Sequence, residues 1–186
     1  REKATSRLAL EFEQDRSEKL LLNILPAPIA ERLKRDERTI ADGYADVCVL
    51  FADLVNFTKL SEEMSPNQIV SLLNQIFSAF DQLADKHGLE KIKTIGDAYM
   101  VAGGLDYRID HDYVIATAEM AKDMHAAVAQ LTPSGREPLA LRVGIATGPA
   151  VAGVIGTKKF IYDLWGDTVN IASRIHGEAA VNTTLV

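Results

Sequence analysis

The sequence predicts an α+β fold: an antiparallel sheet in the ferredoxin-like, split βαβ order, with helices on one face, preceded by a long N-terminal helix. Strand-like and helix-like patterns alternate from residue 45 onward. Two strand-like runs meet at Gly96-Asp97, a pair typical of a hairpin turn. The resulting order is strand, helix, two strands, helix, strand, which favours a split βαβ sheet.

Residues 1–43 are predicted to form a helical stalk and transducer element. The segment is charged and has neither Gly nor Pro before Pro26, so one long helix is expected, broken at Pro26 and Pro28 before a short second helix. An apolar seam that would suit a dimerising coiled coil is formed by Leu8, Phe12, Leu22 and Leu25. Asp15 and Lys19 interrupt that seam, so the coiled coil is expected to be weak, and a surface helix packed on the domain is the alternative.

Residues 44–186 are predicted to form the main domain. A buried strand ends at Asp53, and an amphipathic helix follows the Ser65-Pro66 capping signal. The remaining elements are predicted as strands over 89–95, 98–104, 139–148 and 149–156 and helices over 111–131 and 167–175.

Composition excludes several classes of protein. The 186 residues are 47% apolar and carry a formal charge of −6, which argues against a nonspecific nucleic-acid binder. The single cysteine, Cys48, lies in an apolar run and is expected to be a buried thiol. There is no apolar run of membrane-spanning length and no signal-peptide core, so a soluble chain is predicted, one that belongs to something larger.

Two carboxylates are predicted to meet at one end of the sheet. Asp53 ends the first strand and Asp97 begins the second hairpin strand, and these two strands are expected to be central neighbours. A divalent cation, or a pair of them, would relieve the repulsion between the carboxylates, and hard oxygen ligands suit Mg²⁺ or Mn²⁺. Backbone N–H groups of Asn56, Phe57 and Thr58, near the next helix start, could hold a triphosphate. The alternative for each aspartate is a turn or cap residue.

Four motifs carry a resemblance to a known family. They read FADLVNFT, EKIKTIGDAYM, LRVGIATGPAVAGVIG and YDLWGDTVNIASR. Together, over residues 45–175, they resemble the catalytic domain of class III nucleotidyl cyclases, the adenylyl and guanylyl cyclase family. The stretch LLLNILPAPIAERLK also resembles the helical transducer that precedes this domain in receptor-type and membrane-anchored cyclases.

The resemblance implies a homodimer with composite active sites, phosphoryl-transfer chemistry and two divalent cations. One chain would supply Asp53, Asp97 and the Leu54 carbonyl to the metals and Arg142 to the phosphates. The other chain would supply Lys93 and Asp163 to the base. Asn170 and Arg174 of that second chain would lie near the ribose and α-phosphate. Read without the resemblance, Lys93 is a surface lysine sharing a strand face with Lys91 and Ile95, Asp163 is a turn residue, and Asn170 and Arg174 share a solvated helix face.

ATP is the predicted substrate. A lysine donor and an aspartate acceptor complement N1 and N6 of adenine, whereas guanine presents the inverse pair, and the family's guanylyl cyclases carry an acid at the position of Lys93 and a small polar or thiol residue at that of Asp163. The rival interpretations are a guanylate cyclase and a catalytically silent regulatory domain. A diguanylate cyclase would carry a Gly-Gly-(Asp/Glu)-Glu-Phe turn where this chain has IGDAY.

The two ends of the chain suggest further expectations. An upstream membrane or sensor domain is expected, which would place this fragment at the cytoplasmic side of the cell membrane. At the other end, HGEAAVNTTLV resembles the family's terminal hairpin but follows SRI too soon. We therefore predict that a stretch of the natural chain is missing between Ile175 and His176.

Overall fold

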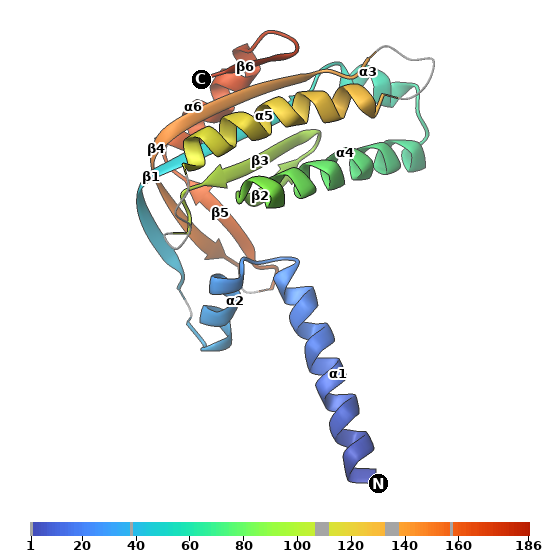
Figure 1. Cartoon of the computed structure of the whole chain (residues 1–186), viewed down its shortest axis with the longest axis vertical. Helices are drawn as coiled ribbons and strands as arrows, with labels where there is room; N and C mark the ends of the chain where they lie inside the picture. The colour runs from blue at the N-terminus through green and yellow to red at the C-terminus, as the bar shows by residue number, and fades with distance from the viewer. Residues whose placement is uncertain (1, 38, 107–111, 133–137, 157) are drawn as a thin grey trace. The chain divides into compact units, whose positions relative to one another are not determined.

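The computed structural model describes residues 2–37, 39–106, 112–132, 138–156 and 158–186. They fall into two compact units, one of residues 1–42 with 153–163 and one of residues 43–152 with 164–186. The helices are α1 (Glu2–Leu22), α2 (Ala27–Lys34), α3 (Phe57–Glu62), α4 (Pro66–His87), α5 (Tyr113–Gln130) and α6 (Asp167–Glu178). The strands are β1 (Ala41–Leu54), β2 (Glu90–Ile95), β3 (Ala98–Gly103), β4 (Leu141–Ile155), β5 (Ile161–Trp165) and β6 (Thr183–Leu185) (Figure 1).

The sheet has the strand order β2-β3-β1-β4-β5, with β6 paired to β4. Strand β3 runs antiparallel to both β1 and β2, so the predicted antiparallel hairpin and its central pairing with the first strand are confirmed. Strand β6 lies parallel to β4, a pairing that the sequence did not predict. The predicted strands at 139–148 and 149–156 are one strand, β4.

Helices α4 and α5 pack together over β2 and β3 (Figure 1). The predicted capping signal before α4 is confirmed, because Ser65 and Gln68 exchange side chain-to-backbone hydrogen bonds in a capping box. Large apolar side chains from both helices meet the sheet in a buried core that includes Ile76, Phe80, Leu50, Tyr99, Met120 and Met124. Burial of these apolar side chains stabilises the packing of the two helices on the sheet.

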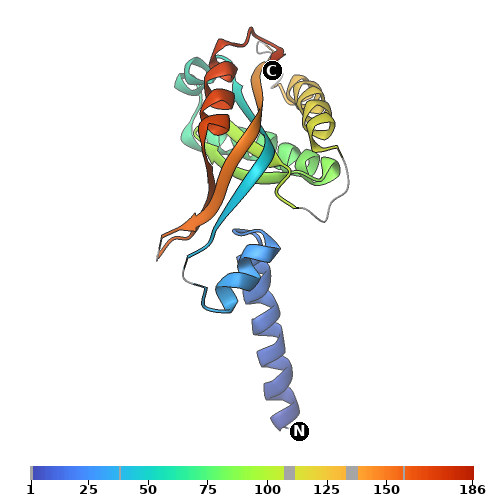
Figure 2. The same ribbon diagram turned by 90° about the vertical axis from the view of Figure 1, so that its left-hand side faces the viewer.

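The prediction that helices cover one face of the sheet is wrong, because α6 packs on the other face. The ring of His176 on α6 stacks on Phe51 of β1, with ring centroids 5.8 Å apart. Gly144 of β4 lets α6 approach closely, since a Cβ there would lie 2.6 Å from the Ala172 carbonyl oxygen. Figure 2 shows β1 and β4 between α5 and α6. Strand β1 is therefore covered on both faces.

A β-bulge corrects the predicted strand face of Lys93. Lys91 lies opposite Val101, but Lys93 lies opposite Met100, so the register shifts between the two lysines. Lys91 faces α4, where its ammonium group contacts Asp81. Lys93 lies on the opposite face, together with Ile95. The predicted shared face of Lys91 and Lys93 is wrong because the extra residue, Ile92, reverses the alternation.

The N-terminal unit is held together by ion pairs. Lys34 at the end of α2 contacts Glu18 of α1 at 2.6 Å, and Arg32 pairs with both Glu37 and Asp42. Phe12 and Leu22 of the predicted seam are exposed, but Leu25 is 2% exposed and so is buried within its own chain. The side chain of Leu8 lies outside the described residues. Within the described residues, no helix combines the length and apolarity needed to cross a membrane.

Helix α6 is continuous through Ile175 and His176. The geometry therefore gives no support for a missing stretch at that point. Whether the natural gene encodes additional residues there stays a prediction, and sequencing the transcript across this position checks it.

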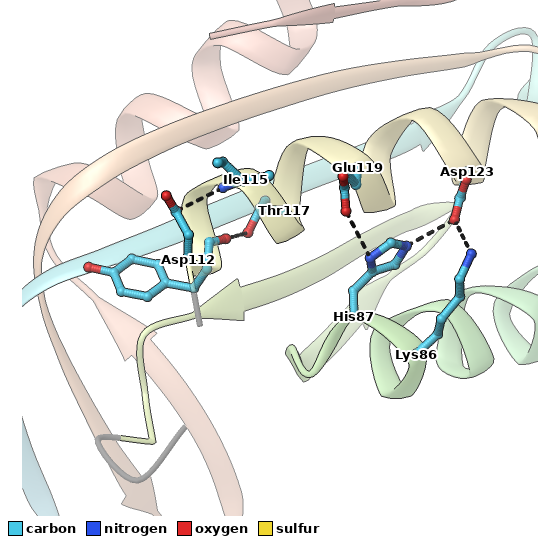
Figure 3. Close-up of polar contacts among 8 residues, drawn as sticks. Lys86, His87, Asp112, Ile115, Thr117, Glu119 and Asp123 are labelled. Carbon is cyan, nitrogen blue, oxygen red and sulfur yellow. Dashed lines mark hydrogen bonds and ion pairs between the residues drawn. The ribbon is translucent and has the colours of Figure 1, made fainter. Parts of the chain in front are cut away.

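Polar contacts join α4 to α5 at the end of the helix pair (Figure 3). Lys86 and His87, the last residues of α4, contact the Asp123 carboxylate at 2.7 Å and 2.9 Å. Hydrogen bonds from both residues lower the pKa of Asp123. At the start of α5, Asp112 caps the helix by accepting hydrogen bonds from the N–H groups of Val114 and Ile115. The predicted helix 111–131 thus begins at Tyr113, and His111 lies outside the described residues.

Glu90 at the start of β2 makes the stability of the fold depend on pH. Burial, and to a smaller extent the charges of Asp85 and Asp106, raise the pKa of Glu90 from 4.5 to about 7. The folded protein thus holds this proton more tightly than the unfolded chain. The stabilisation is complete below the unfolded pKa and is lost as the pH rises through about 7.

We therefore expect Glu90→Gln, which mimics the protonated side chain, to raise the free energy of unfolding by about 2 kcal/mol at pH 8 and by much less at pH 5. Urea unfolding at both pH values measures the difference. Glu178→Gln on the exposed end of α6 is the matched control and should change neither value. An equal effect of Glu90→Gln at both pH values would contradict the assignment.

Candidate active site

Asp53 and Asp97 lie together at one end of the β1–β3 pair. Asp53 is the partner of Ala98 in the antiparallel register, so Asp97 comes one residue before the position opposite it. Gly96, with φ at +59°, takes the left-handed conformation that the hairpin turn needs. The predicted juxtaposition of the two carboxylates is confirmed, and their role as ligands stays a prediction.

Both carboxylates line an open hollow of about 550 Å³. Its other lining residues are Leu54, Asn56, Phe57, Thr58, Lys59, Glu62 and Arg142. The hollow therefore brings together every residue that the sequence assigned to metal ions or phosphates. Lys59 and Glu62 were missed; they lie three residues apart in the short helix α3, which begins at Phe57, and so share one face.

Arg142 of β4 is paired with Asp53. Its Nη2 donates to Asp53 Oδ2 at 2.7 Å, and the Asp53 side chain is 14% exposed. This hydrogen bond raises the pKa of Arg142, and the charge of Asp97 adds to the effect. Among the described residues, no group bonds to the second carboxylate oxygen of Asp53, Oδ1, or to Arg142 Nε, although both are buried.

The site has the chemistry of a divalent-cation site. Carboxylates and main-chain carbonyls are the hard oxygen ligands that Mg²⁺ and Mn²⁺ prefer. A buried carboxylate oxygen without a partner is costly, and a cation would satisfy Asp53 Oδ1. In the described part of the chain, no three His, Cys, Asp or Glu side chains cluster with metal-binding geometry. A cation here would thus depend on Asp53, Asp97 and main-chain oxygen.

The chain between β1 and α3 is shaped for close approach to the hollow. Asn56 precedes α3 in the left-handed conformation, with φ at 60°, which is unusual for a residue with a side chain. The N–H group of Val55 is anchored on the Ala140 carbonyl at 2.8 Å. The first N–H groups of any helix have no intrahelical acceptor, and Phe57 and Thr58, the first two residues of α3, line the hollow.

The residues predicted to contact the base and ribose are not among those that line the hollow. Lys93 is half-buried on β2, and Asn170 and Arg174 are exposed one turn apart on α6. Asp163 lies on β5 in the other compact unit, where its side chain is 8% exposed. Within one chain, the structure therefore groups the phosphate and metal residues but not the rest of the predicted set.

Comparisons with known proteins match this chain to one family. The family profile described as the adenylate and guanylate cyclase catalytic domain matches residues 40–186. An adenylate cyclase of Mycobacterium tuberculosis is 50% identical over 182 residues, which is 97% of this chain and 41% of that protein. The human atrial natriuretic peptide receptor 2 is 44% identical over 165 residues, 88% of this chain and 16% of the receptor. The chain thus spans less than half the length of these relatives.

A solved structure has the same fold. The catalytic core of a rhodopsin-guanylyl cyclase with converted specificity, in complex with ATPαS, superposes with a TM-score of 0.73 at 32% identity. The superposition covers 78% of this chain and 79% of that one.

Proposed function

This chain belongs to the family of adenylate and guanylate cyclase catalytic domains, and we propose that it is an adenylate cyclase that converts ATP to 3′,5′-cyclic AMP and pyrophosphate. The observation that carries the proposal is the convergence of Asp53, Asp97 and Arg142 on one hollow beside the start of α3. Two carboxylates and a guanidinium around one open space suit a triphosphate that brings its own cations.

The chemistry is attack of the ribose 3′ oxygen on the α-phosphorus, with pyrophosphate as the leaving group. The protein mainly aligns the groups and offsets developing charge. Bound divalent cations, Mg²⁺ or Mn²⁺, supply positive charge that favours the 3′ alkoxide and balances the phosphate oxygens. Asp53, Asp97 and the Leu54 carbonyl would hold them, while Arg142 and the N–H groups of the 56–58 segment bind phosphate oxygens.

The active site is composite, formed by two copies of the chain. Lys93 and Asp163 of one copy read the adenine, and Asn170 and Arg174 of that copy lie near the ribose and α-phosphate. None of these four lines the hollow formed by Asp53 and Asp97 within a single chain, which supports their delivery by a second copy. A homodimer would therefore be the active species.

Turnover of ATP and GTP, with the product identified by chromatography, tests the assignment. Cyclic AMP as the main product in the presence of Mn²⁺ is the expected result. Cyclic GMP as the main product would favour the guanylate cyclase alternative, to which the likeness to a rhodopsin-guanylyl cyclase also points. No product from either nucleotide would favour a catalytically silent regulatory domain.

We propose that the helical element, residues 1–43, transmits a signal from an upstream membrane or sensor domain to the catalytic domain. Both the element and the catalytic domain would then lie at the cytoplasmic side of the membrane. Phe12 and Leu20 on α1 are 68% and 58% exposed, an apolar surface that a second α1 would cover. Arg32 is paired with Asp42 at the beginning of β1, so movement of α2 would reach the strand that carries Asp53. The helical element would thus set how often two catalytic domains meet.

We expect deletion of residues 1–22 to raise the protein concentration needed for half-maximal specific activity by about fivefold, because a weak dimer contact is lost. Phe12→Glu in the complete chain should act in the same direction. Gln14→Glu introduces the same charge at a polar position of α1 and is the control. If specific activity follows the same curve against concentration in all four proteins, α1 has no part in dimerisation.

A further inference from the structure

We infer that Arg142 occupies the place of a cation at Asp53 when no nucleotide is bound, and that a triphosphate draws its guanidinium away and so opens the carboxylate to divalent metal. The inference rests on the proposed cyclase function, and it adds a coupling between metal loading and nucleotide arrival. It assigns Arg142 two successive partners rather than one.

The first support is the geometry of the ion pair. Arg142 Nη2 lies 2.7 Å from Asp53 Oδ2, the length of a charge-assisted hydrogen bond. Asp53 Oδ1 is buried without a partner. In this state the carboxylate has one oxygen bound to the guanidinium and one oxygen unsatisfied, so a cation that needs both oxygens must displace Arg142.

The second support is that Arg142 is weakly held. Among the described residues, its other hydrogen bond runs from Nη1 to the Gly177 carbonyl and is 3.4 Å long. Its Nε is buried without a partner among the described residues. A guanidinium has five N–H donors, and within the described part of the chain one short bond engages it. Its side chain is 33% exposed, so the group has both unused donors and room to turn toward an incoming anion.

The third support is the charge of the hollow. Without ligands, Arg142 offsets part of the negative charge of Asp53 and Asp97, which would otherwise repel each other. Once a divalent cation sits between the carboxylates, the guanidinium would face like charge at short range. A triphosphate offers Arg142 better partners, because planar guanidinium groups bind phosphate oxygens in pairs. The exchange therefore moves the guanidinium away from the bound cation, which repels it, and toward phosphate oxygens, which attract it.

The coupling has a thermodynamic consequence. If the nucleotide removes Arg142 from Asp53, nucleotide and metal must favour each other's binding by the same factor. Metal affinity in the absence of nucleotide is then lower than the carboxylates alone would provide. Removing the guanidinium should raise that affinity directly.

Mn²⁺ binding to the nucleotide-free chain, followed by electron paramagnetic resonance, measures this without any turnover. We expect Arg142→Gln to tighten Mn²⁺ binding about tenfold, equivalent to about 1.4 kcal/mol. Lys59→Gln is the matched control, because Lys59 lines the same hollow and its loss removes the same charge without touching Asp53. This control should change the affinity by less than about twofold. Arg142→Lys, which keeps the charge but loses the planar fork, should tighten binding by a smaller factor and serves if the glutamine variant unfolds.

Each outcome decides the question. Tightening in both Arg142 variants but not in Lys59→Gln supports the inference. Equal tightening in Arg142→Gln and Lys59→Gln shows only a general charge effect and overturns it, as does unchanged affinity in both. Asp53→Asn separates this result from the proposed function: if Mn²⁺ binds equally well without the Asp53 carboxylate, the metal site itself is wrong, and the inference fails with it.

Discussion

Asp97→Ala is expected to abolish turnover of both ATP and GTP, with a loss of at least about a thousandfold. The substitution leaves Asp53 as the one carboxylate of the pair that can hold the divalent cations. The divalent cations that balance the phosphate charge would thus lose one of their two carboxylate ligands. Turnover would fall because phosphoryl transfer depends on alignment and on balanced charge more than on a protein base. Cyclic nucleotide formation with Mn²⁺, at saturating nucleotide, measures the loss.

The fold should survive this substitution, since Asp97 lies in a hairpin turn rather than in the core. Thermal unfolding close to that of the unaltered protein would show that the lost activity is not lost structure. Asp85→Ala removes an exposed carboxylate from α4 and should retain activity. Cyclic AMP formation by Asp97→Ala at the rate of the unaltered protein would refute the proposed role of this residue in catalysis.

Most of the order of strands and helices could be predicted because most elements repeat one simple pattern, but α3, β5 and β6 were not predicted. Gly96-Asp97 marked the hairpin, and Ser65-Pro66 marked the start of α4. The packing of α6 on the second face of the sheet was not predicted, although the sequence of β1 indicated a strand covered on both faces. Residues 47–52 are all buried, and such a continuous apolar run is typical of a strand covered on both faces. An alternating run would have indicated a single covered face.

The strand face of Lys93 could not be predicted, because nothing in the alternation of 91–95 announces a bulge. A bulge depends on how the partner strand pairs, and that information is not local. The metal and phosphate residues were easier to place. Asp53 lies near the end of β1 and Asp97 just before β3, so the strand order brings the two carboxylates together. Arg142, near the beginning of the neighbouring strand β4, was assigned from the family resemblance and lines the same hollow. Lys59 and Glu62 lie in a helix too short to show a period.

The double variant Lys93→Glu with Asp163→Cys is expected to shift the preference between ATP and GTP by about a hundredfold toward GTP. Adenine accepts at N1 and donates from N6, whereas guanine donates from N1 and accepts at O6. A glutamate at position 93 would accept the N1 hydrogen of guanine, and a small thiol at 163 removes an acceptor that would oppose O6. Values of kcat/KM for the two nucleotides measure the shift.

The bulge in β2 supplies the control for this swap. Lys91→Glu makes the same charge change two residues away, but Lys91 lies on the other face of the sheet and pairs with Asp81. It should therefore lower stability, because two acids would then meet on the α4 side, and leave the ratio of kcat/KM values unchanged. If general negative charge on β2 set the preference, both lysine variants would move the ratio equally. If Lys93 contacts the base, only substitutions at 93 and 163 change the ratio of kcat/KM values. Each single variant should lose ATP turnover without a full gain in GTP turnover, because one mismatched polar pair remains.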